Sequence, residues 1–226
     1  MKKQILLLSL FCGFLQPLAA QLVSFVGVQG GYTLSRISNV SGYPDHVPGF
    51  KAGISARSWL SRRFCLLAEL NYETKGAQGS IQYTDSTGNE ISSEKKDLSA
   101  AYLTLPVMAR YYEPVGRKLH LFAEAGLYYG YLLKAIVSPA EPGTSGDVTS
   151  SFKRNDFGLT GGVGAEYRLK RGHAVSLGWR YGMGVLNVSD LPLPGGGWRS
   201  SSHLFQLGFA YSLNKPAQHE HPHADF

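Results

Sequence analysis

Charged side chains that could pair with one another recur on one face of several strand-like segments. Within each segment they share the same parity, so they point to the same side of a strand. Opposite charges that meet away from water form short, hydrogen-bonded ion pairs. We therefore expect a network of ion pairs inside the protein, formed by Lys51, Arg57, Glu69, Glu73, Arg110, Glu124, Asp156, Glu166 and Arg180.

The C-terminal stretch has the residue types of a metal site. Imidazoles and carboxylates bind divalent metals, and the stretch carries His219, Glu220, His221, His223 and Asp225. Two prolines in it disfavour regular structure, and nothing in the spacing preorganises a coordination shell. We expect residues 214–226 to be a flexible, His-rich tail without a metal site.

Two further patterns could suggest catalysis or a cofactor. Gly161, Gly162 and Gly164 do not complete a dinucleotide-binding fingerprint, and no helix start follows them. Serines are abundant and three histidines, at 120, 173 and 203, lie near strand ends, as in some lipid-modifying barrels. Neither a nucleophile elbow nor a zincin motif is present. The sequence therefore predicts no enzyme and no cofactor.

The elements that position the charged residues are strands. An alternation of period two recurs in eight segments, at about 25–34, 50–59, 64–74, 98–112, 119–133, 152–169, 173–186 and 203–213. With 27 glycines, 12% aromatic and 17% charged residues, the composition suits tightly curved sheet. We expect an all-β fold: an eight-stranded antiparallel transmembrane β-barrel with the up-and-down order of a meander.

The lengths of the connections predict the orientation of this barrel. Connections of about three to five residues alternate with connections of about 15 to 23 residues. In transmembrane barrels the short turns face the periplasm and the long loops face outward. We expect the longest outer loops at 76–97 and 135–151.

One parity of each strand is apolar, as in Leu103, Leu105 and Val107. Periodicity alone leaves open whether this face contacts lipid or lines the cavity of a soluble barrel. An Arg or Lys facing lipid at the membrane midplane would cost about 2–4 kcal/mol, so we expect the charged parity inside. Aromatic residues near strand ends suit interfacial girdles, although each could equally make ordinary cross-strand contacts: Phe64, Tyr72, Tyr111, Tyr131, Tyr167, Tyr181 and Tyr211.

The N-terminus has the pattern of a secretory signal peptide over residues 1–20. Lys2 and Lys3 precede an apolar run at 5–15, and Ala19 and Ala20 end the segment. The residues before Cys12 do not form a lipobox. Cys65 is then the only cysteine of the mature chain, so no intramolecular disulfide can form. Residues 21–213 form the expected barrel domain.

Three segments resemble the PorT-like outer-membrane β-barrel family of Bacteroidetes: YLTLPVMARYY at 102–112, LHLFAEAGLYYGYLL at 119–133 and FGLTGGVGAEY at 157–167. The resemblance spans the mature chain up to residue 213. It implies a barrel in the bacterial outer membrane and carries over no catalytic residues. Pro106, inside the fourth strand, is expected to mark a bulge.

The expected partners follow from the barrel. They are outer-membrane lipid, the barrel-assembly machinery, and a protein bound through the outer loops. The strand at 204–213 has the alternating aromatic character of a signal for the assembly machinery. The net charge of +6 includes no long basic run, so nucleic acid is not expected. Two functions remain: a structural or interaction barrel with a filled interior, and a narrow channel for ions or small solutes.

Overall fold

The structure is a computed structural model that describes residues 23–38, 46–84, 90–139, 145–186 and 199–213. The predicted signal peptide and the predicted His-rich tail lie outside these residues. None of the described helices is long and apolar enough to cross a membrane.

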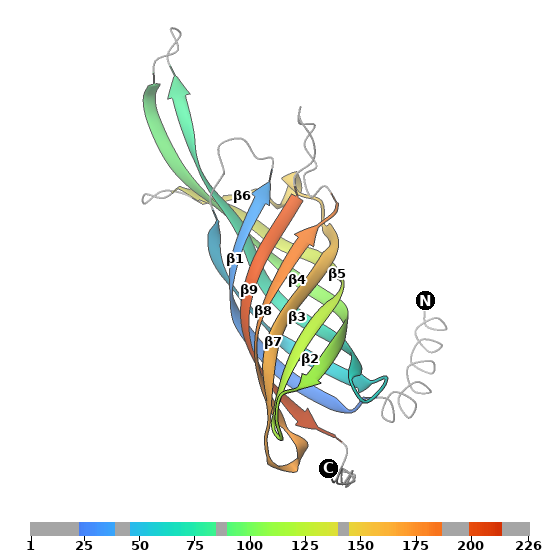
Figure 1. Cartoon of the computed structure of the whole chain (residues 1–226). Coiled ribbons are helices and arrows are strands. Elements are labelled where there is room, and N and C mark those ends of the chain that lie inside the picture. Colours follow the sequence, from blue (N-terminus) through green and yellow to red (C-terminus); the bar gives the residue numbers. More distant parts are fainter. Residues whose placement is uncertain (1–22, 39–45, 85–89, 140–144, 187–198, 214–226) are drawn as a thin grey trace, which may run out of the picture.

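Eight long strands close into a single barrel (Figure 1). Each strand pairs antiparallel with its neighbour in the chain, and the first pairs with the last, so no barrel strand is left at an edge. The predicted antiparallel meander is confirmed. The strands are β1 (Phe25–Ser38), β2 (Val47–Trp59), β3 (Phe64–Thr84), β4 (Glu90–Pro114), β5 (Leu119–Pro139), β7 (Asn155–Arg168), β8 (Ala174–Gly184) and β9 (Arg199–Ser212).

Three short turns lie at one end of the barrel. They join β2 to β3, β4 to β5, and β7 to β8, the last through the 3-10 turn η2 (Lys170–Gly172). In η2 the backbone is left-handed at Arg171, with φ of 62°, and at Gly172, with φ of 82°. Phe25 pairs with Ser212, which places the start of β1 and the end of β9 at the same end. We call it the short-turn end.

At the opposite end, strand occupies part of the two longest predicted outer loops. β3 and β4 stay paired from Lys75–Ala100 to Thr84–Glu90, so the expectation of a loop at 76–97 is wrong. Figure 1 shows this β3–β4 ribbon projecting beyond the barrel. Residues 79–96 lack the alternation that indicated the other strands, and strand pairing through backbone hydrogen bonds does not require it. The expected loop at 135–151 also contains strand, because β5 continues to Pro139 and pairs with β6 (Gly146–Asp147), which precedes the 3-10 turn η1 (Thr149–Ser151).

Pro106 does not mark a bulge. The pairing of β4 with β5 runs without a shift through Pro106–Tyr128, and the register with β3 is the same on both sides of it. Instead, pairing with β3 is missing between Ala68–Val107 and Asn71–Thr104. A proline has no N–H to donate to a ladder, which accounts for a local gap. The register of the β4–β5 pairing shifts at Ala101/Tyr102, where Leu133 of β5 has no partner in the ladder.

The two faces of the barrel wall differ in polarity. Leu103, Leu105 and Val107 point outward and are 40%, 46% and 42% exposed. The alternate residues Thr104 and Met108 are buried inside. The apolar parity therefore forms the outer surface. Outward aromatic side chains are found near strand ends at Phe64, Tyr167, Tyr181 and Tyr211, whereas Tyr72 and Tyr131 point outward from the middle of β3 and β5.

Two apolar clusters fill the interior near its ends. The short-turn cluster contains Cys65, Tyr112 and Phe122, with Trp59 packed against it. The outer cluster contains Ala77, Leu98, Ala100, Tyr102, Leu132, Ala135 and Phe152. The large rings fit because glycines face them: a Cβ on Gly164 would lie 2.4 Å from Cζ of Phe122, and one on Gly158 would lie 2.5 Å from Cε1 of Tyr128.

Candidate functional site

All nine charged residues singled out from the sequence point into the barrel, between the two apolar clusters. None is more than 8% exposed. They come from six strands: Lys51 and Arg57 from β2, Glu69 and Glu73 from β3, Arg110 from β4, Glu124 from β5, Asp156 and Glu166 from β7, and Arg180 from β8.

The first part of the network joins β2, β4 and β7. Arg57 Nη1 lies 2.6 Å from Glu166 Oε2. Tyr112 accepts a hydrogen bond from Arg57 at 2.6 Å and donates one to Glu166 at 3.0 Å. Arg110 Nη1 donates to the same phenol at 3.2 Å. The Tyr112 hydroxyl therefore connects two guanidinium groups to one carboxylate.

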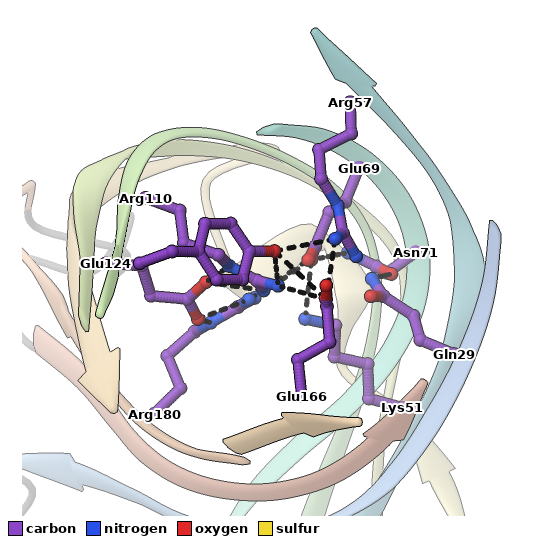
Figure 2. A network of polar contacts seen from close by, with 10 residues as sticks. Gln29, Lys51, Arg57, Glu69, Asn71, Arg110, Glu124, Glu166 and Arg180 are labelled. Carbon is purple, nitrogen blue, oxygen red and sulfur yellow. Dashed lines mark hydrogen bonds and ion pairs between the residues drawn. The ribbon is translucent and has the colours of Figure 1, made fainter. Parts of the chain in front are cut away.

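Arg180 connects the second part across the interior (Figure 2). Its Nε lies 2.8 Å from Glu124 Oε1, and its Nη1 lies 2.8 Å from Glu69 Oε2. Glu124 also holds Arg110, whose Nη2 is 2.6 Å from Glu124 Oε2. Lys51 completes the chain at 3.0 Å from Glu69. Seven of the nine predicted residues thus form one continuous network.

Asp156 belongs to a separate group of side chains, nearer the end of the barrel opposite the short turns. Its Oδ2 accepts hydrogen bonds from Lys75 at 3.1 Å, Ser200 at 2.9 Å and Tyr128 at 3.2 Å. The Lys75 ammonium also lies 4.6 Å from the centre of the Tyr128 ring, a cation–π distance. Lys75 and Asp156 therefore neutralise each other just below the outer cluster.

Glu73 is not joined to another charge by a short contact. Among the described residues its carboxylate accepts one long hydrogen bond, from Thr104 Oγ1 at 3.4 Å. It lines a small polar cavity of about 30 Å³ together with Lys51, Lys75 and Arg180. A cavity of this size holds roughly two water molecules.

A larger hollow of about 600 Å³ lies on the outward apolar surface and is not part of the interior. It surrounds Ala56 and Ala68, which are paired in the β2–β3 ladder.

Sequence reasoning missed several members of these groups. Lys75 has the same parity as Glu69 and Glu73, but it lies just beyond the predicted end of the third strand at residue 74. Tyr112 and Tyr128 also point inward, but they carry no charge, so the pattern of charged residues does not indicate them. Gln29 and Asn71 extend the network: Gln29 Nε2 donates to Asn71 at 2.8 Å, and Asn71 Nδ2 donates to Glu69 at 3.1 Å.

The buried charges balance. With Lys75 included, the described interior holds five cations and five carboxylates. Removing one partner from such a set leaves an uncompensated charge in a low-dielectric interior. No group of three or more potential metal ligands occurs in the part of the chain that the structure describes. The arrangement therefore suits closure of the interior.

A titratable group at the outer rim is held by its neighbour. Thr149 donates to Asp147 Oδ1 from its hydroxyl at 2.6 Å and from its backbone N–H at 2.9 Å. These hydrogen bonds lower the pKa of Asp147 below its usual value, the hydroxyl contributing most. Thr149 is also bonded to the backbone of Ala135, so Asp147 helps to hold η1 against β5.

Several solved structures are similar to this chain. Neisserial surface protein A is 16% identical, with 83% of this chain and 96% of that chain covered and a TM-score of 0.46. Ail of Yersinia pestis is 15% identical, with 83% and 99% covered and a TM-score of 0.40. OprG of Pseudomonas aeruginosa is 10% identical, with 84% and 97% covered and a TM-score of 0.43. No curated protein sequence gives a significant match.

The sequence profile of one family covers most of the chain. The profile described as outer membrane protein beta-barrel domain matches residues 19–190. The closed eight-stranded barrel with an apolar outer surface is the architecture that such a match requires. The chain therefore belongs to the outer membrane protein β-barrel domain family and resides in the bacterial outer membrane.

Proposed function

We propose that this protein is a structural and interaction barrel whose interior is closed to solutes. The observation that carries the proposal is that ion pairs cross the interior from wall to wall. Arg180 on β8 binds Glu69 on β3, and Arg57 on β2 binds Glu166 on β7. An eight-stranded barrel is only wide enough for side chains to fill. Apolar clusters flank the network on both sides.

The β3–β4 ribbon supports the interaction role. It extends both strands beyond the rest of the barrel, on the side away from the short turns (Figure 1). Exposed segments presented by a rigid scaffold commonly carry binding functions. We propose that a protein partner binds there, and that outer-membrane lipid and the barrel-assembly machinery are the barrel's other partners. Segments 102–112, 119–133 and 157–167 favour placement near the PorT-like barrels of Bacteroidetes.

The alternative function is a narrow channel for ions or small solutes. The polar cavity beside Glu73 favours it, because a conducting path would need such water-sized spaces. The cavity is lined by Lys51, Lys75 and Arg180, whose side chains are engaged with carboxylates. Ion passage would therefore require these pairs to separate.

Conductance in a planar lipid bilayer tests the proposal. The folded wild-type barrel is expected to give no discrete channels, and so is the control variant Leu207→Ala, which alters only the outward face. The paired substitutions Arg110→Ala and Glu124→Ala remove two inward side chains that contact each other. Reproducible wild-type channels whose conductance changes with this double substitution would replace the closed-barrel proposal with the channel.

A further inference from the structure

Exposed cations gather on all three short turns. Arg62 and Arg63 precede β3, Arg117 and Lys118 precede β5, and Lys170 and Arg171 lie in η2. We call these six the short-turn cations. Glu113 is the one exposed carboxylate described at this end, and it is already paired with Arg63 at 2.8 Å. The short-turn end thus carries a strong excess of positive charge.

Backbone hydrogen bonds tie two of the three turns to neighbouring strands. Arg168 N–H donates to the Lys118 carbonyl at 2.8 Å, which joins the end of β7 to the β4–β5 turn. Tyr112 N–H donates to the Arg63 carbonyl at 2.8 Å, which joins β4 to the β2–β3 turn. The six cations are therefore presented together at the short-turn end.

Two of these cations lie beside outward aromatic side chains. Lys118 Nζ is 5.9 Å from the centre of the Tyr167 ring, and Arg63 Nη1 donates to the Tyr111 hydroxyl at 2.9 Å. Tyr111 packs against the exposed Phe64 with ring centres 5.0 Å apart. Tyrosines and other aromatics collect where a membrane meets water. The cations beside them are therefore at the height of lipid headgroups.

We propose that the short-turn cations bind anionic phospholipid headgroups in the membrane leaflet at the short-turn end. A headgroup phosphate accepts two parallel hydrogen bonds from an arginine and a single strong one from a lysine. Each Lys or Arg beside an anionic membrane surface strengthens binding about fivefold. The six cations are spread over three turns, so they bind several lipids around the rim rather than one lipid in a pocket.

Competition between two lipids tests this inference. The folded protein is released from micelles that contain equal amounts of phosphatidylglycerol and phosphatidylcholine with identical acyl chains, and the retained lipids are counted by native mass spectrometry. The wild type is expected to retain mainly phosphatidylglycerol. This preference should fall at least about fivefold in a six-site variant that replaces all the short-turn cations by glutamine. Its substitutions are Arg62→Gln, Arg63→Gln, Arg117→Gln, Lys118→Gln, Lys170→Gln and Arg171→Gln. Concentrated salt should also weaken the preference in the wild type.

A variant at the other end of the barrel is the matched control. Arg36→Gln, Lys134→Gln and Arg199→Gln remove three exposed cations away from the short turns and should keep the preference. Equal retention of both lipids by the wild type would overturn the inference. A preference that survives in the six-site variant, or that falls as far in the control, would overturn it too. If the six-site variant does not fold, the two wild-type measurements, lipid choice and its salt dependence, decide the question.

Discussion

Arg180 is the side chain whose loss should destabilise the barrel most clearly. It joins two carboxylates, Glu69 and Glu124, with four nitrogen–oxygen contacts of 2.7 to 3.0 Å. In Arg180→Leu, Glu69 keeps Lys51 and Glu124 keeps Arg110. Removing one partner of a buried pair costs about 3–5 kcal/mol, and we take the lower end, about 3 kcal/mol, because each carboxylate retains one cation. For a chain of this size that corresponds to a fall in Tm of about 6–12 °C.

Thermal unfolding of the purified barrel measures this fall in Tm. Far-UV circular dichroism follows the transition, and so does the difference in gel mobility between the folded and unfolded forms. The control is Arg63→Leu, which breaks the Arg63–Glu113 pair at 2.8 Å. That pair is about half exposed on both sides, so its loss should cost about 0–1 kcal/mol. A Tm of Arg180→Leu equal to that of wild type, or a fall no larger than in the control, would refute the reasoning from buried charge.

Three further predictions concern packing, the outer ribbon and pH. Gly158→Val should lower stability by about 1–3 kcal/mol in urea unfolding because its Cβ would overlap the Tyr128 ring, whereas Gly116→Ala, with nothing within 4 Å of a new Cβ, should have no effect. Replacing residues 79–96 by Asn-Gly should leave Tm unchanged, since Gln78 and Asp97 are register partners that a two-residue turn can join; a large fall in Tm would show that the ribbon stabilises the barrel. Because the pKa of Asp147 is lowered in the fold, its contribution is fully present above the unfolded value of 3.8 and is lost as the pH falls through the lower, folded value. The protection factor of the Thr149 amide, which corrects for the intrinsic pH dependence of hydrogen exchange, should therefore fall at low pH in the wild type but not in Asp147→Asn, and equal pH profiles of the protection factor would contradict this.

The pattern of residue types along the chain is enough to predict the class of fold and the polar face of most strands. An alternation of period two indicates a strand wherever one face contacts lipid and the other faces the polar interior. Side chains toward lipid must then be apolar, and those toward the interior can be polar. Leu103, Leu105 and Val107 lie outside for this reason, and the intervening Thr104 lies inside. The same reasoning failed for the β3–β4 ribbon, because most of its sequence does not alternate and its pairing depends on the backbone ladder.

Which charges meet depends on how the barrel closes. Glu69 and Arg180 are 111 residues apart and face each other because closure of the barrel brings β3 opposite β8. The parity of a residue in its strand places its side chain inside the barrel, but its height along the barrel axis decides which side chains it contacts. Glu73 therefore lies beside a cavity, whereas Lys75 reaches Asp156. Strand register and barrel closure set those heights, and they depend on contacts between distant segments that a periodic pattern does not contain.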